Sequence, residues 1–359
     1  MKPVRILVET LADRGLLNAQ MGNALEIIAR LDPEGFHVTT FHSASPDQRL
    51  ALRPNTRLIP LPPRRQTVRI LQEFLFGAHD LLFYVKASPA SRVYMMLRRF
   101  RGRQGLTVST VEGQSNAQHE PTVSKATIRL LEQTALRADH IFSNSRFVQR
   151  SLHENYGLAS EVVPTGVDTK FFSPAEGRPE NIRLRVLFVG SLRPFKGPQV
   201  VLEAARRFSS ADFVIVGDGI MREQLGRDSA ALPNVELKGA LGAERLIEEY
   251  RCADVFLFPS RWEGSPKVLA EAAACGLPVV ARRDYEPETV IHGETGLLGA
   301  DDADILSHLE RLLASRDLRQ RMGCRALSHI ARFDWDLITK KWEGIFLRLT
   351  AQNVGRCRV

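Results

Sequence analysis

The chain has 359 residues, more than one hydrophobic core usually organises, so two domains of roughly 150–200 residues are expected. Hydrophobic residues make up 44% of the chain and charged residues 25%, which excludes a disordered chain and is typical of an ordinary globular protein. No stretch approaches the ~20 apolar residues that span a membrane. The first apolar run, residues 6–8, has charged neighbours and is too short for a signal peptide, so a strand is expected there.

Short apolar runs recur along the chain, each followed by a segment with helical spacing. The runs of the second half are continuous rather than alternating, which indicates parallel strands buried on both faces. Alternation of strand and helix predicts βαβ units and doubly wound sheets. The expected strands of the first half are 6–8, 38–41, 81–85, 107–110, 141–144 and 162–164, and those of the second half are 186–189, 213–216, 255–258 and 278–281.

A segment rich in Pro, Gly and charge, residues 172–179, separates the two series, and we place a linker at about 170–182. The predicted fold class is therefore α/β, with two Rossmann-like doubly wound domains facing a cleft. The first would span residues 1–170 and the second 171–334. Within residues 335–359 we expect an amphipathic helix that packs back toward the first domain.

Positive charge is concentrated in one segment of the first half. The net charge of the chain is +8, yet residues 49–103 alone hold 12 Lys or Arg and 2 Asp or Glu. Such a segment attracts anionic surfaces, and we expect it to dock on an inner membrane leaflet; a solvated face is the alternative. A nucleic-acid partner is not expected, because aromatic residues do not alternate with the basic ones. The clustered arginines are Arg64, Arg65, Arg69, Arg92, Arg98, Arg99, Arg101 and Arg103.

The cysteines occur singly rather than at the close spacing of a metal site, and three of them lie in or near apolar segments. We therefore expect inert thiols in a reducing compartment. This predicts a cytoplasmic protein. The four residues are Cys252, Cys275, Cys324 and Cys357.

Residues 259–280 carry the strongest chemical pattern: Pro-Ser-Arg-Trp-Glu-Gly-Ser-Pro-Lys-Val-Leu-Ala-Glu-Ala-Ala-Ala-Cys-Gly-Leu-Pro-Val-Val. A buried strand ends where this segment begins, and a helix is expected to start near Ser265. This serine would be the N-cap, with Pro266 at the first helical position. The unpaired amides of the first turn, from Ser265 to Val268, suit a pyrophosphate, and Lys267 adds a positive charge there.

Two glutamates of the same segment are candidates for ligand contacts. Glu263 precedes the helix, at the carboxyl end of the strand, where open α/β sheets bind ligands. Glu271 lies farther along the helix and is suited to accept hydrogen bonds from two ribose hydroxyls, as acidic residues do in dinucleotide sites. The alternative is an ordinary strand-turn-helix unit with surface glutamates. The complete pattern of residues 259–280 disfavours this alternative.

A second motif, residues 186–198, forms a strand, a glycine loop and a helix start: Val-Leu-Phe-Val-Gly-Ser-Leu-Arg-Pro-Phe-Lys-Gly-Pro. Gly190 permits close backbone approach, and Pro198 suits a helix N-terminus. Lys196 places a positive charge at this helix start. The alternative is a surface Arg and Lys near an ordinary turn.

Together these motifs resemble the nucleotide-sugar signature of retaining glycosyltransferase family 4, also called glycosyltransferase group 1. That signature has two glutamates separated by seven residues, followed by Ala-Xaa-Ala-Cys-Gly-Xaa-Pro-Val-Val. The likeness covers roughly residues 138–300 well and 1–137 poorly. It implies a GT-B-like fold, in which the first domain binds the acceptor and the second binds the nucleotide sugar.

The resemblance also implies roles for particular residues. The family's first glutamate lies by the donor sugar and its second by the ribose, and an Arg and a Lys hold the leaving diphosphate, so Lys196 and Glu263 are the catalytic candidates. Ser191 stands at the position where the family usually has the arginine, which is a departure from the family. Arg193, two residues farther along, is the candidate to take the place of that arginine. The implied nucleotide-sugar contacts are Gly190, Ser191, Arg193, Lys196, Gly197, Gly217, Leu241, Gly264, Ser265, Lys267, Val268 and Glu271.

The first half departs further from the family. A glycine pair often follows the family's first strand, whereas this chain has the single Gly15, followed by Asn18. A His-Gly pair commonly follows a middle strand, where this chain has Glu112 and then a glycine, with His119 nearby. We expect Gly15, Asn18, Glu112 and His119 to belong to an acceptor site or a loop of the first domain.

The expected activity is transfer of a hexose-type sugar, with retention of anomeric configuration, from a UDP-sugar or GDP-sugar. The acceptor would be a glycan or a lipid-linked molecule in cell-surface polysaccharide synthesis. No cofactor and no metal are expected, because Lys196 is suited to neutralise the leaving diphosphate. The alternatives are a related two-domain phosphorylase or epimerase, and a non-catalytic protein that binds a nucleotide sugar or a polyanion. The ribose contact implied for Glu271 argues against a phosphorylase.

Overall fold

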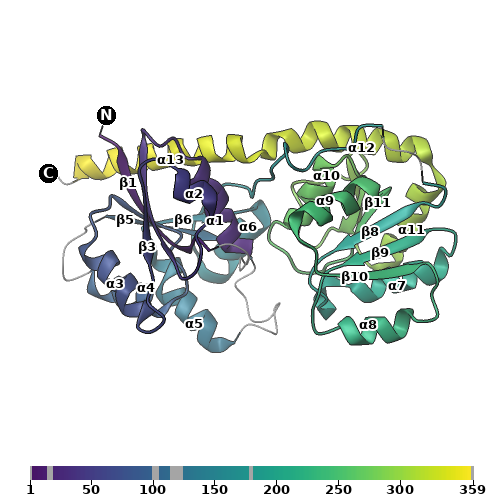
Figure 1. The fold of residues 1–359 in the computed structure, drawn as a ribbon, viewed down its shortest axis with the longest axis horizontal. Helices are drawn as coiled ribbons and strands as arrows, with labels where there is room; N and C mark the ends of the chain where they lie inside the picture. The colour runs from purple at the N-terminus through teal and green to yellow at the C-terminus, as the bar shows by residue number, and fades with distance from the viewer. Residues whose placement is uncertain (1, 14–18, 99–104, 114–123, 178–180, 357–359) are drawn as a thin grey trace. The chain divides into compact units, whose positions relative to one another are not determined.

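The computed structural model of the chain describes residues 2–13, 19–98, 105–113, 124–177 and 181–356 (Figure 1). The chain divides into two compact units. Unit 1 combines Met1–Thr165 with Trp335–Val359, and unit 2 is Gly166–Asp334. These divisions lie within a few residues of the boundaries expected at 170 and 334, and each unit is described by itself below.

In the described residues of unit 1, seven strands form one parallel sheet in the order β3-β2-β1-β4-β5-β6-β7. The order reverses between β1 and β4, as in a doubly wound sheet. The strands are β1 (Val4–Leu11), β2 (Phe36–His42), β3 (Thr56–Pro60), β4 (Leu81–Phe83), β5 (Leu106–Val111), β6 (His140–Ser143) and β7 (Glu161–Val162). The helices are α1 (Ala19–Arg30), α2 (Gln48–Leu52), α3 (Gln66–Phe76), α4 (Pro89–Leu97), α5 (Lys125–Gln133), α6 (Arg146–Tyr156) and α13 (Trp335–Arg356), with the 3-10 turn η1 (Ala135–Arg137).

The last helix belongs to the core of unit 1, in agreement with the sequence expectation. Helix α13 packs beside α1 and joins the same apolar cluster as β1, β2 and β4. Trp342 and Phe346 each place their ring centroids 4.9 Å from that of Phe83 on β4. A separate apolar cluster joins the sheet to α3 and α4, where the rings of Phe74 and Tyr94 meet edge to face. Aromatic burial of this kind is the main source of stability in such a core.

In the described residues of unit 2, six strands form a parallel sheet in the order β10-β9-β8-β11-β12-β13. The strands are β8 (Arg185–Val189), β9 (Asp212–Val216), β10 (Val235–Gly239), β11 (Val255–Phe258), β12 (Val279–Arg282) and β13 (Gly296–Gly299). The helices are α7 (Pro198–Arg207), α8 (Arg222–Ser229), α9 (Ala243–Cys252), α10 (Lys267–Ala274), α11 (Asp302–Ala314) and α12 (Arg316–Ile330), with 3-10 turns η2 (Pro194–Lys196) and η3 (Ala331–Phe333).

The predicted α/β class is confirmed and each of the ten predicted strands overlaps an observed one, although 162–164 shares only Val162 with β7. The sequence did not reveal β3, β10 and β13. Each of these three strands lies at an edge of its sheet. An edge strand has a neighbouring strand on one side only, and its residues need not form a continuous apolar run. Strand β3, for example, reads Thr-Arg-Leu-Ile-Pro and buries a single residue. The prediction that the two domains face a cleft stays a prediction. Among the described residues, no helix combines the length and the apolar character needed to cross a membrane.

Candidate functional site

The strand order of the second sheet reverses between β8 and β11, which are hydrogen-bonded neighbours. Strands β9 and β10 follow on one side, and β12 and β13 on the other. Ligands of open α/β sheets bind outside the carboxyl ends of the strands at such a switch point. The segment that leaves β8 carries Lys196, and the segment that leaves β11 carries Glu263.

Lys196 and Glu263 meet at this switch point as an ion pair. The Lys196 ammonium donates a hydrogen bond to Oε1 of Glu263. The same carboxylate oxygen accepts a hydrogen bond from Oγ of Ser260 at 2.5 Å. The Lys196 Nζ also lies 5.4 and 5.5 Å from the ring centroids of Phe195 and Phe258. Both charged side chains are mostly buried, at 18% and 11% exposed, so their charges are only weakly screened by water.

Three loops of unit 2 approach one another so closely that glycine is required. Gly197 has a φ of +72°, and a Cβ there would lie 2.8 Å from the carbonyl oxygen of Pro259. Gly217 has a φ of +140°, and a Cβ there would lie 1.9 Å from the carbonyl oxygen of Gly190. These contacts hold the loop after β8 against the loops after β9 and β11. The close approach between the first two loops depends on Gly217, whereas a Cβ on Gly190 would meet ring carbons of Phe188 and Phe258.

Helix α10 begins at Lys267, and Pro266 occupies the N-cap position with extended backbone. The expectation that Ser265 caps the helix, with Pro266 at the first helical position, is wrong. The backbone of Pro266 is itself extended, so the helix starts one residue later than expected. The first-turn amides of Lys267 and Val268 still lie at the end of α10 that follows β11, after the buried Gly264.

Glu271 lies on α10 and is held by a neighbouring helix. The hydroxyl of Tyr250, on α9, donates to Oε2 of Glu271 at 2.8 Å. Burial raises the pKa of Glu271, and the Tyr250 hydrogen bond and the charge of Lys267 oppose that rise in part. The carboxylate is thus fixed in position at a site where its charge is poorly solvated.

The remaining predicted residues of unit 2 lie on the same set of loops. Ser191 and Arg193 are both exposed on the loop after β8. Because the Arg193 side chain is accessible on the same loop, Arg193 stays the candidate for the role of the arginine that the family has at position 191. Leu241 is half-buried between β10 and α9. The loop after β9 is tied to that region, because the amide of Gly217 donates to the carbonyl of Gly239 at 2.8 Å.

In unit 1 the structure describes one of the four predicted residues. Glu112 follows β5, and its carboxylate accepts hydrogen bonds from the hydroxyl of Tyr84 and, at 2.8 Å, from Nδ2 of Asn23. Its backbone carbonyl accepts from Nδ2 of Asn144 at 3.1 Å. Glu112 is therefore a fixed group. The other three predicted residues, Gly15, Asn18 and His119, lie outside the described residues.

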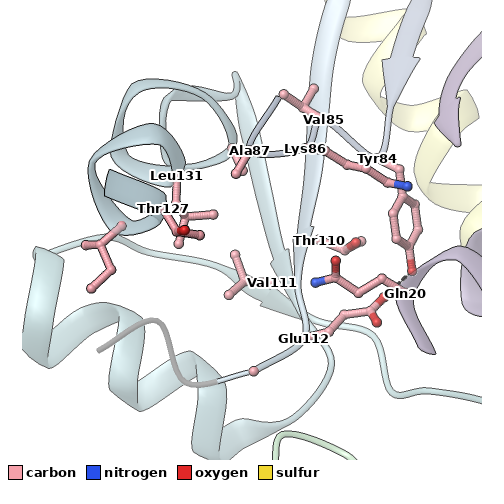
Figure 2. Close-up of a pocket in the computed structure, with 13 residues that line it drawn as sticks. Gln20, Tyr84, Val85, Lys86, Ala87, Thr110, Val111, Glu112, Thr127 and Leu131 are labelled. Carbon is pink, nitrogen blue, oxygen red and sulfur yellow. Dashed lines mark hydrogen bonds between the residues drawn. The ribbon is translucent and has the colours of Figure 1, made fainter. Parts of the chain in front are cut away.

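A pocket of about 350 Å³ lies beside Glu112 at the carboxyl ends of β4 and β5 (Figure 2). Ligand pockets typically measure roughly 300–1,000 Å³, so this one suits a small ligand. Helices α1 and α5 complete its walls. The lining residues are Gln20, Tyr84, Val85, Lys86, Ala87, Thr110, Val111, Glu112, Gly113, Thr127, Ile128, Leu131 and Ala135.

Sequence reasoning missed Ser260 and Tyr250, which hold the two predicted glutamates. Ser260 stands three residues before Glu263 in the same loop, so its proximity was a usable signal. Tyr250 lies on a different helix from Glu271, and nothing in the spacing of these two residues indicates that they meet. Lys86, which lines the pocket of unit 1, was also missed, because a single lysine after a strand carries no recognisable pattern.

Models of two protein families match the chain. The model described as Glycosyltransferase Family 4 matches residues 18–171, and the model described as Glycosyl transferases group 1 matches residues 183–315. The two matches fall in the first and second halves of the chain and together cover most of it. The poor likeness of residues 1–137 to the family, as judged from motifs, is therefore corrected: a family model recognises most of that segment.

Curated relatives carry names of glycosyltransferases. The chain is 33% identical over 245 residues to the D-inositol 3-phosphate glycosyltransferase of Acidothermus cellulolyticus, covering 60% of this chain and 54% of the relative. It is 29% identical over 337 residues to the GDP-mannose-dependent alpha-(1-6)-phosphatidylinositol monomannoside mannosyltransferase of Mycolicibacterium smegmatis, covering 86% and 84%. The chain spans between 51% and 66% of the length of several of the relatives that it matches.

Solved structures share the fold over nearly the whole chain. The sucrose-phosphate synthase of Thermosynechococcus elongatus matches with a TM-score of 0.80 and 19% identity, covering 97% of this chain and 100% of that one. The Anabaena protein Alr3699/HepE, solved in complex with UDP-glucose, matches with a TM-score of 0.74 and 17% identity, covering 98% and 99%. The structural likeness shows a shared fold, and two family models account for both halves of the sequence. The chain thus carries a Glycosyltransferase Family 4 domain in its first half and a Glycosyl transferases group 1 domain in its second.

Proposed function

We propose that the chain transfers a hexose-type sugar from a nucleoside diphosphate sugar to an acceptor, with retention of anomeric configuration. One observation carries this proposal: Lys196 and Glu263 meet at the switch point of the second sheet, beside the first turn of α10. A cation, a carboxylate and a helix N-terminus at the carboxyl ends of parallel strands are the groups that a sugar diphosphate requires.

Breaking the bond between a sugar and a diphosphate builds negative charge on the leaving phosphate and positive charge on the sugar ring. The Lys196 ammonium and the amides of Lys267 and Val268 supply positive charge for the leaving group. Glu263, beside the same lysine, supplies negative charge near the donor sugar. Glu271 accepts hydrogen bonds from the ribose, in the orientation that Tyr250 holds. Retention follows from the family's chemistry and is part of the proposal.

The donor carries UDP or GDP. HepE was solved with UDP-glucose, and the Mycolicibacterium relative is named as GDP-mannose-dependent. The chain itself offers backbone and aliphatic groups near Leu241, after β10, for the base. The aliphatic groups can pack against the face of a uracil or a guanine, and the backbone groups can form hydrogen bonds with its edge. We assign the base site to the loop between β10 and α9.

Unit 1 binds the acceptor, which we propose to be a glycan or a lipid-linked molecule of cell-surface polysaccharide synthesis. Its helices α3 and α4 lie against each other (Figure 1). Both helices expose large apolar side chains. Phe76 is 70% exposed and Met96 60% exposed. An exposed apolar stripe flanked by arginines fits an anionic lipid surface, where each basic residue contributes about 1 kcal/mol. The exposed residues of this face, which we call the α3–α4 face, are Arg64, Arg65, Val68, Phe76, Arg92, Val93, Met96 and Leu97.

Charge on the α3–α4 face favours a lipid partner over a second protein surface of mixed charge. In the described residues from 61 to 98 the acidic residues are Glu73 and Asp80. Glu73 is buried and pairs with Arg57, and Asp80 pairs with Arg5.

Flotation with vesicles containing phosphatidylglycerol should recover the protein at low salt. The recovery should fall with 0.5 M salt, with neutral vesicles, and in a variant carrying Arg64→Glu, Arg65→Glu and Arg92→Glu. Equal recovery by neutral vesicles contradicts the membrane proposal.

The activity itself is tested by incubating the purified chain with UDP-glucose and GDP-mannose and measuring release of the nucleoside diphosphate. Slow hydrolysis, or transfer to an added acceptor, is expected with one of the two donors. Thermal stabilisation by the matching nucleoside diphosphate should accompany it, because a ligand that binds the folded state raises stability by mass action. Stabilisation without any turnover of either donor would indicate a binding protein instead of an enzyme.

A further inference from the structure

The pocket of unit 1 is a built site rather than a surface hollow. Tyr84, at the end of β4, has a φ of +63°, which is strained for a residue with a side chain. The loop that follows is held by Glu9 of β1, which is 6% exposed. The Glu9 carboxylate accepts hydrogen bonds from the amide of Lys86 at 2.8 Å, from Oγ of Ser88 at 2.5 Å, and from Oγ of Ser91. A buried carboxylate and a strained tyrosine thus fix the wall of the pocket.

One side of the pocket is polar. Figure 2 shows the side chains of Gln20, Lys86, Thr110 and Glu112 gathered on the side of Tyr84. The Thr110 hydroxyl is buried beside them. These groups present an amide, an ammonium, a hydroxyl and a carboxylate within one small volume. Such a set is suited to the hydroxyl groups of a polyol, which both donate and accept.

The opposite side is aliphatic. Val111 and Leu131 face the pocket from β5 and α5, away from the polar groups (Figure 2). Val85 and Ile128 extend this wall. An aliphatic wall packs against the C–H face of a saturated ring, while an opposing polar wall contacts its hydroxyls. The two-sided lining and the small volume therefore match a single polyol ring.

The charges of the pocket do not favour a phosphate. Among the described residues that line it, Lys86 is the one cation and Glu112 is an anion. Glu9 accepts a hydrogen bond from the Lys86 amide, and both Glu9 and Glu112 interact electrostatically with the Lys86 ammonium. Two carboxyl groups therefore already act on the Lys86 ammonium. A phosphate group here would meet the Glu112 carboxylate, and like charges placed together across an interface oppose binding.

We infer that this pocket receives the acceptor as an uncharged polyol ring, and that Glu112 determines specificity by accepting a ring hydroxyl and rejecting phosphorylated rings. The inference rests on the proposed function and adds the class of acceptor to it. The relatives named for D-inositol 3-phosphate would then differ from this chain in the charge of the acceptor ring.

The test compares neutral rings with their phosphates on the full chain. The pairs are inositol against D-inositol 3-phosphate, and glucose against glucose 6-phosphate, each with the donor that the protein turns over. Transfer is measured as kcat/KM for the acceptor. Binding is measured independently by saturation-transfer NMR in the presence of the nucleoside diphosphate. The neutral member of each pair should be preferred by about tenfold or more, as expected for one like-charge contact.

Two variants separate a specificity role from a structural one. Glu112→Gln should lower the use of neutral rings and reduce the discrimination against their phosphates. Ile128→Trp, on the half-buried face of α5, should fill the pocket and raise the acceptor KM. The matched control is Glu132→Gln, which removes the same charge from the exposed face of α5 and should behave as wild type.

Preference for the phosphorylated member of both pairs would overturn the inference, as would an unchanged acceptor KM in both Glu112→Gln and Ile128→Trp. Failure of the proposed function looks different, because donor hydrolysis and transfer are then absent with every acceptor. In that case the NMR comparison still decides the inference. Neutral rings should give saturation transfer that Ile128→Trp abolishes, and equal or stronger signals from the phosphates contradict it.

Discussion

Lys196 and Glu263 form an ion pair although 67 positions separate them along the chain. They meet because β8 and β11, which precede them, are neighbours in the second sheet. Ser260 holds the same glutamate oxygen from within the loop. The pair gives the proposed donor site a cation whose position is fixed by a partner before any phosphate binds. This preorganisation is what electrostatic catalysis requires.

Replacing Lys196 should therefore slow sugar transfer without unfolding the protein. We expect Lys196→Ala to lower kcat by about 10²–10³, the usual cost of removing one preorganised group that stabilises developing charge. The measurement is release of nucleoside diphosphate at saturating donor. The control is Lys340→Ala, which removes an exposed lysine of α13. Wild-type turnover in Lys196→Ala would remove this residue from the mechanism.

Glu271 should contribute to binding of the ribose. Glu271→Gln is expected to weaken nucleoside diphosphate binding by roughly 10–100-fold, the range for hydrogen bonds to a charged group. The loss should be much smaller for a 2′,3′-dideoxy nucleotide, which lacks both hydroxyls. Calorimetry on the two nucleotides gives the comparison, and Glu248→Gln on the exposed face of α9 is the control. Equal losses for both nucleotides would mean that Glu271 does not contact the ribose.

Nucleotide binding should also depend on pH through Glu271. Burial raises the pKa of this carboxyl above its ordinary value of 4.5, so it protonates at a higher pH than an exposed glutamate. The protonated form is a poorer acceptor for two hydroxyls. Affinity should therefore be full at pH values above the raised pKa and should fall as the pH drops through it. Titration calorimetry across this range should show the loss in wild type and a flat profile in Glu271→Gln.

The close approach of Gly217 to Gly190 should make a single methyl group costly. Gly217→Ala places a Cβ 1.9 Å from the Gly190 carbonyl oxygen, on a backbone with a φ of +140°. We expect a loss of more than about 2 kcal/mol in unfolding free energy, since strained backbone alone costs about 1–3 kcal/mol. Gly226→Ala, within α8 and with open space around it, should instead stabilise by about 0.5–1 kcal/mol. Urea unfolding of both variants tests the contrast, and similar effects would contradict the described loop packing.

Arg98 and Asp139 form a buried ion pair that ties α4 to the strands of unit 1. Oδ2 of Asp139 accepts hydrogen bonds from Arg98 at 2.7 Å and from the Thr107 amide at 2.8 Å. Asp139→Asn should cost up to about 3–5 kcal/mol at pH 7, because it removes the charged partner of a mostly buried guanidinium. The exposed pair of Arg183 and Asp212 provides the control, where Asp212→Asn should cost at most about 1 kcal/mol.

The lowered pKa of Asp139 fixes the direction in which the unfolding free energy changes with pH. Burial alone would raise the pKa of Asp139, but the hydrogen bonds from Thr107 and Arg98 outweigh it and hold the pKa below the ordinary value of 3.8. Because the folded-state pKa is lowered, the stabilisation is complete above 3.8 and is lost as the pH falls through the lowered value. Unfolding free energies should therefore converge for wild type and Asp139→Asn in acid. A difference that persists unchanged below that pH would exclude the linkage.

The sequence by itself determined the features that depend on neighbouring residues. Continuous apolar runs predicted the inner strands of both sheets, and the segment 259–280 identified Glu263, Lys267 and Glu271, which share one strand-helix unit. Short-range signals of this kind arise from periodicity and local backbone preference. They fail at β3 and β10, two edge strands that lack a continuous buried run, and at the start of α10, where Pro266 has extended instead of helical backbone.

Only the tertiary structure decided which distant residues meet. The pairing of Lys196 with Glu263 depends on the strand order that places β8 beside β11. Tyr250 reaches Glu271 because α9 and α10 pack on the same sheet, and Tyr84 reaches Glu112 because β4 and β5 are neighbours. Contacts of this kind come from the burial of whole helix and strand faces. No single residue or spacing encodes them, so they become visible only when the sheets are assembled.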